Sequence, residues 1–308
     1  MKLNEAKNTF LISMKGVKSP ATIKWYKRRL SSLESFLGSD IEIDSISVHN
    51  LRKWRALLTD QNKRYENHPT RSEEVGGLSR DTIHGYIRAT RRFFSWLVEE
   101  GFLGKNPSKR FEFPALQKRP KSGISDFDRI AMLDVARSQN LRNYAMLMFV
   151  ADTGCRASGL AGLKITDLDI SRRRATVYEK GRGGNGKGRI VYILPETAVT
   201  LHAWLSQKSD KDDSYVFSSV HGGGLTPTGI YLIFKRIAKE AKVKGRWSPH
   251  QWRHWRARKW AQGGMNLGIV AQLLGHTDVK VTSDYYGTFA DADLQQAHLK
   301  YTLVETTL

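Results

Sequence analysis

The first third of the chain repeats apolar residues at helical spacing behind serines that can cap a helix. Ser19 and Pro20 form a cap and first-turn pair. The apolar residues that follow recur at three- and four-residue steps, namely Ile23, Tyr26, Leu30, Leu33 and Leu37. This is the period of a helix with one buried face. Similar series follow Ser45 and Ser79, so residues 1–113 are expected to fold as helices alone.

Prolines mark a boundary between two domains. The stretch 114–120 begins and ends with proline and holds adjacent Lys and Arg, and helices cannot continue through it. We therefore expect a helical domain over 1–113, a basic linker over 114–122 and a second domain over 123–308. Within the first domain the polar segment 62–77, which ends in two glycines, is expected to be a loop.

The second domain combines helical periodicity with one pair of strands. Residues 175–179 and 189–194 are rich in Val, Ile and Tyr, and the glycine-rich stretch 181–188 between them predicts an antiparallel hairpin. Helix signals surround the hairpin, at 125–136 and 141–152 and behind Pro195, Pro227, Pro249 and Asn266. The expected fold class is mainly α, with an all-α N-terminal domain and a mainly helical second domain that contains a small antiparallel β-sheet.

The charge of the chain indicates a polyanionic partner. Of 308 residues, 50 are Lys or Arg and 30 are Asp or Glu, which gives a net charge of +20. The excess is shared evenly between residues 1–120 and the remainder. Proteins this basic commonly bind nucleic acid, an anionic membrane or an acidic partner. Because the charge is not confined to a tail, both domains are expected to contribute to binding.

Cysteine content and hydropathy favour a cytoplasmic protein. Cys155 is the only cysteine and cannot form an intrachain disulfide. The longest apolar run, residues 144–151, is far shorter than the roughly 18 residues that span a bilayer. Residues 10–12 form too short an apolar region for a signal peptide. We expect no contact with a membrane.

Three segments carry polar residues where a plain hydrophobic core would not place them. Arg156 follows a glycine turn directly after an apolar helix. His250 and Arg253 lie three residues apart at a capped helix start and therefore share one face. His276 ends a Leu-Leu-Gly-His segment, and Tyr285 follows it by nine residues. Each segment alone is a weak signal, because an arginine after a turn is usually a solvated surface residue.

In this order and spacing the segments resemble the tyrosine recombinase (phage integrase) family. Its members carry an arginine in a T-G-x-R-x-S-E-L segment, a lysine on a β-hairpin, an H-x-x-R segment, an L-G-H segment and a tyrosine nine residues on. Six residues match these positions in turn: Arg156, Lys180, His250, Arg253, His276 and Tyr285. The segment Ser19–Tyr26 and the third helix are similar to the family's core-binding domain, so the resemblance spans most of the chain.

The resemblance implies an enzyme that cuts and rejoins DNA at specific sites through a 3′-phosphotyrosyl intermediate. Breaking a phosphodiester without metal or ATP needs a nucleophile that stores the bond, positive donors around the phosphorane oxygens and an acid for the leaving oxygen. Tyr285 would be the nucleophile, and His250 would exchange a proton with its hydroxyl. Lys180 would protonate the departing 5′ oxygen.

The remaining matched residues would hold the phosphate. The planar guanidinium of arginine suits bidentate contact with phosphate, so Arg156 and Arg253 would clamp the non-bridging oxygens. His276 would add a further hydrogen-bond donor. Neither a metal ion nor an organic cofactor is expected.

One matched segment departs from the family pattern, and two positions have rivals. Three residues after the first arginine, where the family usually has an acidic residue, this chain has Gly159. The support that would orient the arginine is therefore an open question. Lys187, the next lysine of the hairpin, is the rival to Lys180. Tyr286 adjoins Tyr285, and the spacing from the L-G-H histidine favours Tyr285.

Two other motifs suggest bound ions and are disfavoured by their own residues. His250 and His254 form H-x-x-x-H on a helix, but Gln251 stands where a metalloprotease has its glutamate base. Residues 181–187 fit the start of a P-loop, but Gly188 replaces the hydroxyl residue that would bind magnesium.

The sequence thus predicts a nucleoid-associated recombinase that clamps double-stranded DNA between two basic domains, with mobile-element integration and excision as its use. Dimer resolution is a second use of the same chemistry. The resemblance also implies a homotetramer on two DNA sites and accessory DNA-bending proteins. A type IB topoisomerase-like enzyme and a non-catalytic DNA-binding regulator on the same fold remain alternatives. Paired-site strand exchange separates the first, and the presence of all six matched residues argues against the second.

Overall fold

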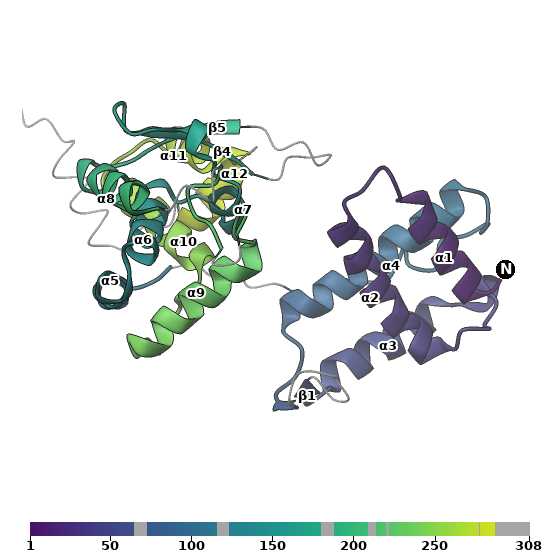
Figure 1. The fold of residues 1–308 in the computed structure, drawn as a ribbon. Helices are drawn as coiled ribbons and strands as arrows, with labels where there is room; N and C mark the ends of the chain where they lie inside the picture. Colours follow the sequence, from purple (N-terminus) through teal and green to yellow (C-terminus); the bar gives the residue numbers. More distant parts are fainter. Residues whose placement is uncertain are drawn as a thin grey trace, which may run out of the picture. The chain divides into compact units, whose positions relative to one another are not determined.

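The computed structural model describes residues 1–64, 73–115, 123–179, 188–208, 214–219, 222–276 and 278–286. The chain divides into two compact units, Met1–Gln117 and Lys118–Leu308 (Figure 1). Each unit has a hydrophobic core of its own. Both units are mainly helical, and the second holds a small antiparallel sheet. The expected fold class is therefore confirmed. None of the described helices is long and apolar enough to cross a membrane.

The first unit is built from α1 (Leu3–Ser13), α2 (Pro20–Leu37), α3 (Val48–Asp60), α4 (Arg80–Glu99) and a 3₁₀ turn over Ile43–Ser45. The predicted caps of α2 and α4 are confirmed, because the Ser19 and Ser79 hydroxyls each accept a backbone N–H at 3.2 Å. The helical series predicted behind Ser45 is confirmed as α3, but Ser45 is not its cap. Ser45 ends the 3₁₀ turn, and the hydroxyl of Ser47 caps α3.

Two elements of this unit were not predicted. The first is α1, whose buried face includes Phe10, a ring that meets Tyr26 and Phe93 edge to face with centroids 5.4 Å apart. The second is the antiparallel pair of β1 (Lys63–Arg64) and β2 (Glu74–Val75). This strand pair is an exception to the expected helices and falls within the segment 62–77 that was expected to be a loop, because strands of two residues are too short to show an alternating pattern.

The second unit consists of eight described α-helices, a three-stranded sheet and a 3₁₀ turn over Ile165–Asp167. The helices are α5 (Asp126–Gln139), α6 (Leu141–Thr153), α7 (Ala157–Ala161), α8 (Pro195–Gln207), α9 (Pro227–Glu240), α10 (Pro249–Gln262), α11 (Leu267–Leu274) and α12 (Val279–Tyr286). The strands are β3 (Leu168–Asp169), β4 (Arg174–Tyr178) and β5 (Gly188–Tyr192), in the order β3-β4-β5. The predicted hairpin is confirmed, since β4 and β5 pair antiparallel with Val177 opposite Arg189.

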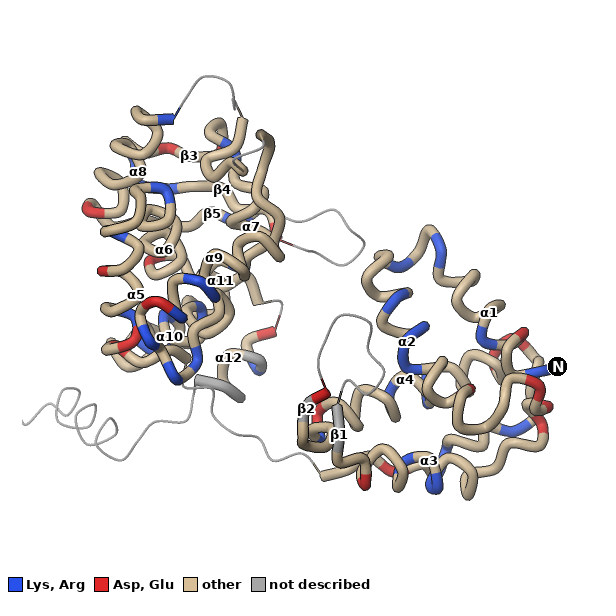
Figure 2. The backbone as a smooth tube through the Cα atoms, turned by 60° about the horizontal axis from the view of Figure 1, so that its bottom comes forward, with Lys and Arg blue, Asp and Glu red and all other residues tan. Residues whose placement is uncertain are grey.

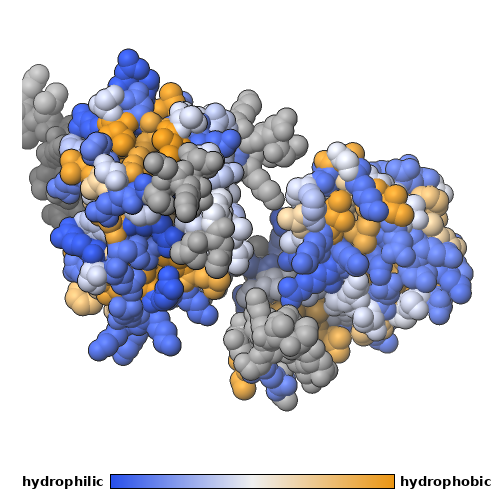
Figure 3. Space-filling view, viewed as in Figure 1, coloured by the Kyte–Doolittle hydropathy of each residue, from blue (hydrophilic) through white to orange (hydrophobic). Residues whose placement is uncertain are grey.

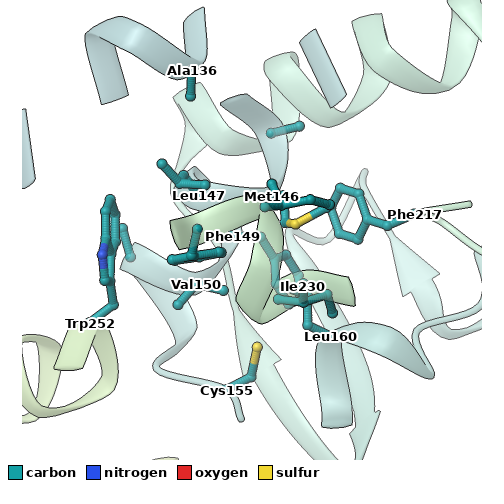
Figure 4. Close-up of a cluster of buried hydrophobic side chains, with 14 of the residues drawn as sticks. Ala136, Met146, Leu147, Phe149, Val150, Cys155, Leu160, Phe217, Ile230 and Trp252 are labelled. Atoms are coloured by element: carbon teal, nitrogen blue, oxygen red, sulfur yellow. The ribbon is translucent and has the colours of Figure 1, made fainter. Parts of the chain in front are cut away.

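The core of the second unit gathers around α6. Phe149 and Val150 of α6 are fully buried, and Trp252 from α10 packs into the same cluster (Figure 4). Cys155 lies at the edge of this cluster and is also fully buried. Burial raises the pKa of its thiol to about 11, so it behaves as a small apolar residue. The core thus fixes α6, whose C-terminal turn leads to Arg156, and α10, which carries Arg253.

Candidate active site

Two helices of the second unit end in left-handed glycines, and predicted site residues follow these turns. Gly154 (φ 56°) ends α6 two residues before Arg156, and Gly275 (φ 67°) ends α11 directly before His276. Glycine adopts this conformation without the steric cost that other residues meet. A Cβ atom at Gly154 would lie 3.2 Å from a methyl carbon of Leu274. The two turns therefore pack closely against each other.

Arg253 joins the two turns from α10. Its side chain is 1% exposed. Its Nη1 donates to the carbonyl oxygen of Gly154 at 2.8 Å, and its Nη2 donates to that of Leu274 at 2.5 Å. Carbonyls at helix C-termini carry partial negative charge, which suits a buried guanidinium. Arg253 thereby fixes the two turns from which Arg156 and His276 emerge.

The carboxylate of Glu179 lies among three arginines. Its Oε1 accepts the backbone N–H of Arg156 at 2.6 Å and Nη2 of Arg189 at 3.1 Å. Its Oε2 contacts Nη1 of Arg156 and lies 3.9 Å from Nη1 of Arg253. Burial by itself would raise the pKa of the Glu179 carboxyl, but the arginine charges and the backbone N–H bring it below its ordinary value. The group is therefore ionised at neutral pH.

Sequence patterns missed both Glu179 and Arg189, although the alternation of strand residues could have indicated them. Ala175 and Val177 of β4 are buried, and residue 179 continues the same face. Arg189 is opposite Val177 in the antiparallel ladder and so belongs to that face as well. An acidic and a basic residue on the buried face of one hairpin are a signal for an internal ion pair.

His276 is neutral at physiological pH. Burial first, and then the charges of Arg253, Arg156 and Arg189, lower the pKa of its imidazole to about 4. Its Nδ1 lies 2.8 Å from the hydroxyl oxygen of Thr282, which is fully buried in α12. This contact ties the turn after α11 to α12.

The structure brings three predicted residues together and positions the backbone of a fourth. Arg156 and Arg253 both lie against Glu179, and His276 is close enough for the charges of these arginines to lower the pKa of its imidazole. Tyr285 belongs to α12, three residues after Thr282 and hence about one helical turn away.

The other predicted residues lie on α10, on α12 or beyond the described part. His250 is exposed in the first turn of α10, with its ring against that of His254 at a centroid distance of 4.3 Å. Tyr286, the rival nucleophile, ends α12. Lys180 and Lys187 lie outside the described residues.

The cluster suits an anionic ligand better than a metal ion. In the described part of the chain, no three His, Cys, Asp or Glu side chains are grouped as metal ligands. The side chain of Arg156 is 38% exposed, so a ligand can reach part of it. Lys and Arg are also frequent along α2 and α10 (Figure 2), and hydrophilic residues cover much of the visible face of each unit (Figure 3). An arginine cluster with a nearby hydrogen-bond donor is typical of phosphate recognition.

Comparison with known protein families gives two matches. Residues 126–291 match the phage integrase family, and residues 2–113 match the phage integrase SAM-like domain. Among curated relatives, the tyrosine recombinase XerD of Listeria monocytogenes is 30% identical over 293 residues, which are 90% of each chain. The tyrosine recombinase XerC of Oceanobacillus iheyensis is 27% identical over 295 residues, 92% of this chain and 90% of the relative.

Solved structures share the fold at lower sequence identity. The Tn1549 transposon integrase in complex with a circular intermediate DNA has a TM-score of 0.77 and 18% identity, covering 98% of this chain and 100% of that one. A lambda integrase dimer bound to a COC′ core site has a TM-score of 0.71 and 13% identity, covering 91% and 97%. These likenesses concern the fold.

Proposed function

Since the chain belongs to the phage integrase family and is a site-specific DNA recombinase, we propose that it cuts and rejoins DNA through a 3′-phosphotyrosyl link to Tyr285. The observation that supports this chemistry is the cluster in which Arg156 and Arg253 share the carboxylate of Glu179 while their charges act on the neutral His276. His276 also contacts the helix that carries Tyr285. The cluster offers positive charge and hydrogen-bond donors to the oxyanion that develops when a nucleophile attacks a phosphate.

The phosphate would be held by groups that differ in accessibility. Arg156, with the more exposed guanidinium, would contact a non-bridging oxygen directly. Arg253 is buried and holds the two turns in place. Its positive charge would stabilise the phosphate from close by. His276, being neutral, would donate a hydrogen bond instead of adding charge.

The proton transfers would involve two further residues. A tyrosine hydroxyl has an unperturbed pKa near 10, so its proton must be removed as it attacks the phosphorus. His250 is proposed to exchange that proton. Lys180, with Lys187 as its rival, is proposed to protonate the 5′ oxygen as the P–O bond breaks. The tyrosyl phosphodiester conserves the bond for rejoining to a second 5′ hydroxyl.

The proposed partner is double-stranded DNA, which both basic units would contact through phosphates. The protein would thus associate with the nucleoid. A homotetramer holding two DNA sites is proposed for strand exchange, with accessory DNA-bending proteins where the sites need them. Integration and excision of a mobile element is the proposed use, and dimer resolution is the alternative. Recovery of two different recombining sites would support the first, and recovery of one repeated site the second.

A covalent-capture experiment tests the proposal. The protein is incubated with random duplexes that carry a nick close to the cleaved position, so that the released fragment diffuses away and the adduct persists. We expect the captured duplexes to share a DNA sequence. Peptide mass spectrometry should locate the 3′ phosphate on Tyr285. Complete absence of adducts across the library would overturn the proposal. Relaxation of supercoiled DNA without exchange between paired sites would instead indicate a topoisomerase-like enzyme.

A further inference from the structure

We infer that Glu179 is the positioning residue that holds Arg156 for the scissile phosphate, and that Gly159 leaves the space in which its carboxylate lies. The inference deepens the proposed function and rests on it. Gly159 stands where the family pattern has an acidic residue.

Glu179 holds Arg156 at two points. One carboxylate oxygen accepts the backbone N–H of Arg156 at 2.6 Å, directly before α7, and the other contacts the guanidinium. The first contact fixes where the residue leaves the turn after Gly154, and the second fixes the direction of its side chain. Because Glu179 is only 6% exposed while Arg156 is 38% exposed, the arginine is held from the protein side and keeps accessible surface.

The same carboxylate balances the other positive charges of the cluster. Arg189 and Arg253 approach it at 3.1 and 3.9 Å. Without an anion, three guanidinium groups packed this closely would repel one another, and the desolvation of their buried charges would be uncompensated. A neutral side chain at position 179 is therefore expected to let Arg156, the most exposed of the three, turn away toward solvent.

A side chain at position 159 would need the space that the carboxylate of Glu179 fills. A Cβ atom at position 159 would lie 3.0 Å from Cγ and 3.3 Å from Oε1 of Glu179, and 3.4 Å from Cβ of Val177. An acidic side chain at 159 would therefore point into the space that the carboxylate of Glu179 occupies. The site has room for one such carboxylate, and α7 or the end of β4 can supply it.

An exchange of the two residues tests this inference. The variants are Glu179→Gln, Gly159→Glu, and the double variant Gly159→Glu with Glu179→Gly. Asp169→Asn is the matched control, because Asp169 also pairs with two arginines, Arg172 and Arg174, but on the exposed turn of the sheet. Cleavage of the captured nicked duplex is followed at saturating protein, so that weaker DNA binding does not affect the rate.

We expect Glu179→Gln and Gly159→Glu each to lower the cleavage rate at least about 100-fold, the typical effect of losing one oriented donor. The dissociation constant for DNA should change by less than about threefold. The exchanged double variant should recover to within about tenfold of the wild type, and Asp169→Asn should cleave normally. A substitution at Glu179 could also lower the rate by disturbing its sequence neighbour Lys180. Recovery of the rate by a carboxylate on α7, at position 159, would exclude that explanation.

An NMR measurement tests the positioning without DNA. A guanidinium held by a carboxylate rotates slowly and gives separate Nη signals, which Arg156→Lys would identify by their loss. We expect these signals in the wild type and the exchanged variant and their averaging in Glu179→Gln. Wild-type cleavage by Glu179→Gln, or a folded exchanged variant with neither the rate nor the signals restored, would overturn the inference. A wild type that forms no adducts would refute the proposed function, and the NMR result would then decide the role of Glu179.

Discussion

The Nδ1 atom of His276 lies 2.8 Å from the Oγ1 atom of Thr282, a contact between the turn after α11 and a fully buried position of α12. A threonine hydroxyl that donates to Nδ1 leaves the proton of a neutral imidazole on Nε2. That nitrogen can then donate to a phosphate oxygen. The same hydroxyl lies one helical turn before Tyr285, so a single contact relates the proposed phosphate donor to the helix of the proposed nucleophile.

Removing this hydroxyl should slow cleavage more than it weakens DNA binding. Thr282→Val keeps the side-chain shape and removes the hydrogen bond, which is worth about 1 kcal/mol, or roughly fivefold to tenfold in rate. Thr282→Ser keeps the hydroxyl and is the control. Single-turnover cleavage of the nicked duplex measures the effect. Equal rates for Val and Ser at this position would argue against a role for the contact.

Removing a single hydroxyl group distinguishes the role of Tyr285 from that of Tyr286. Tyr285→Phe should abolish covalent protein–DNA adducts while DNA binding stays close to normal, because only the attacking hydroxyl is lost. Tyr286→Phe should still form adducts. Gel shifts under denaturing conditions detect the adduct, and gel shifts under native conditions detect binding. Adducts that persist in Tyr285→Phe would show that the nucleophile is misassigned.

The two arginines of the proposed clamp should differ in their effect on stability. Arg156→Ala and Arg253→Ala should each cost about 3 kcal/mol of transition-state stabilisation, on the order of 100-fold in rate. Arg253→Ala also removes hydrogen bonds to two buried carbonyls and should lower the free energy of unfolding by about 3 kcal/mol. Cleavage in buffer with EDTA and urea unfolding measure the two effects. Full activity in either variant, or a strict metal requirement of the wild type, would contradict the clamp.

The lowered pKa of His276 predicts a pH dependence of stability. The imidazole has its ordinary pKa of 6.5 in the unfolded chain and a pKa of about 4 in the folded one. Between these values the unfolded state binds more protons, so this group's stabilising contribution is complete above about pH 6.5 and is lost as the pH falls toward 4. Urea unfolding across this range should show a steeper decline for the wild type than for His276→Gln. Parallel declines would mean that the imidazole is not shielded from protonation.

The segment 289–308 carries an apolar stripe and lies outside the described residues. The stripe consists of residues three and four apart, namely Leu294, Ala297, Tyr301 and Val304. In a helix, such a stripe needs an apolar surface to cover it. If it docks onto a neighbouring protomer, truncation after Thr288 should spare single-site binding, weaken assembly on paired sites and abolish strand exchange. Folding back onto its own catalytic domain is the alternative.

Two full-length variants serve as a matched pair for this test. Leu294→Asp places a charge on the stripe, and Gln295→Asp places one beside it. Only the first should reproduce the effect of truncation in light scattering of the protein–DNA complex. Tetramers and full recombination by the truncated protein would rule out docking in trans.

Features that depend on near neighbours in the chain could be predicted from the residues alone. Ser19 and Ser79 predict the starts of α2 and α4, because a cap bonds to an N–H three residues away and helical periodicity is visible within a few turns. The β4–β5 hairpin was likewise encoded by two apolar runs and the glycines between them. The order and spacing of the matched residues indicated the family by the same kind of local pattern.

The contacts that hold the candidate site together form only in the folded domain. Glu179 meets Arg156 across 23 residues, and Arg253 meets the carbonyls of Gly154 and Leu274 across 99 and 21 residues. No local pattern states which carboxylate will be buried beside which arginine, since the pairing exists only after α6, α10 and the sheet have packed into one core. The sequence therefore predicts the arginines, whereas the packed fold selects the carboxylate that orients them.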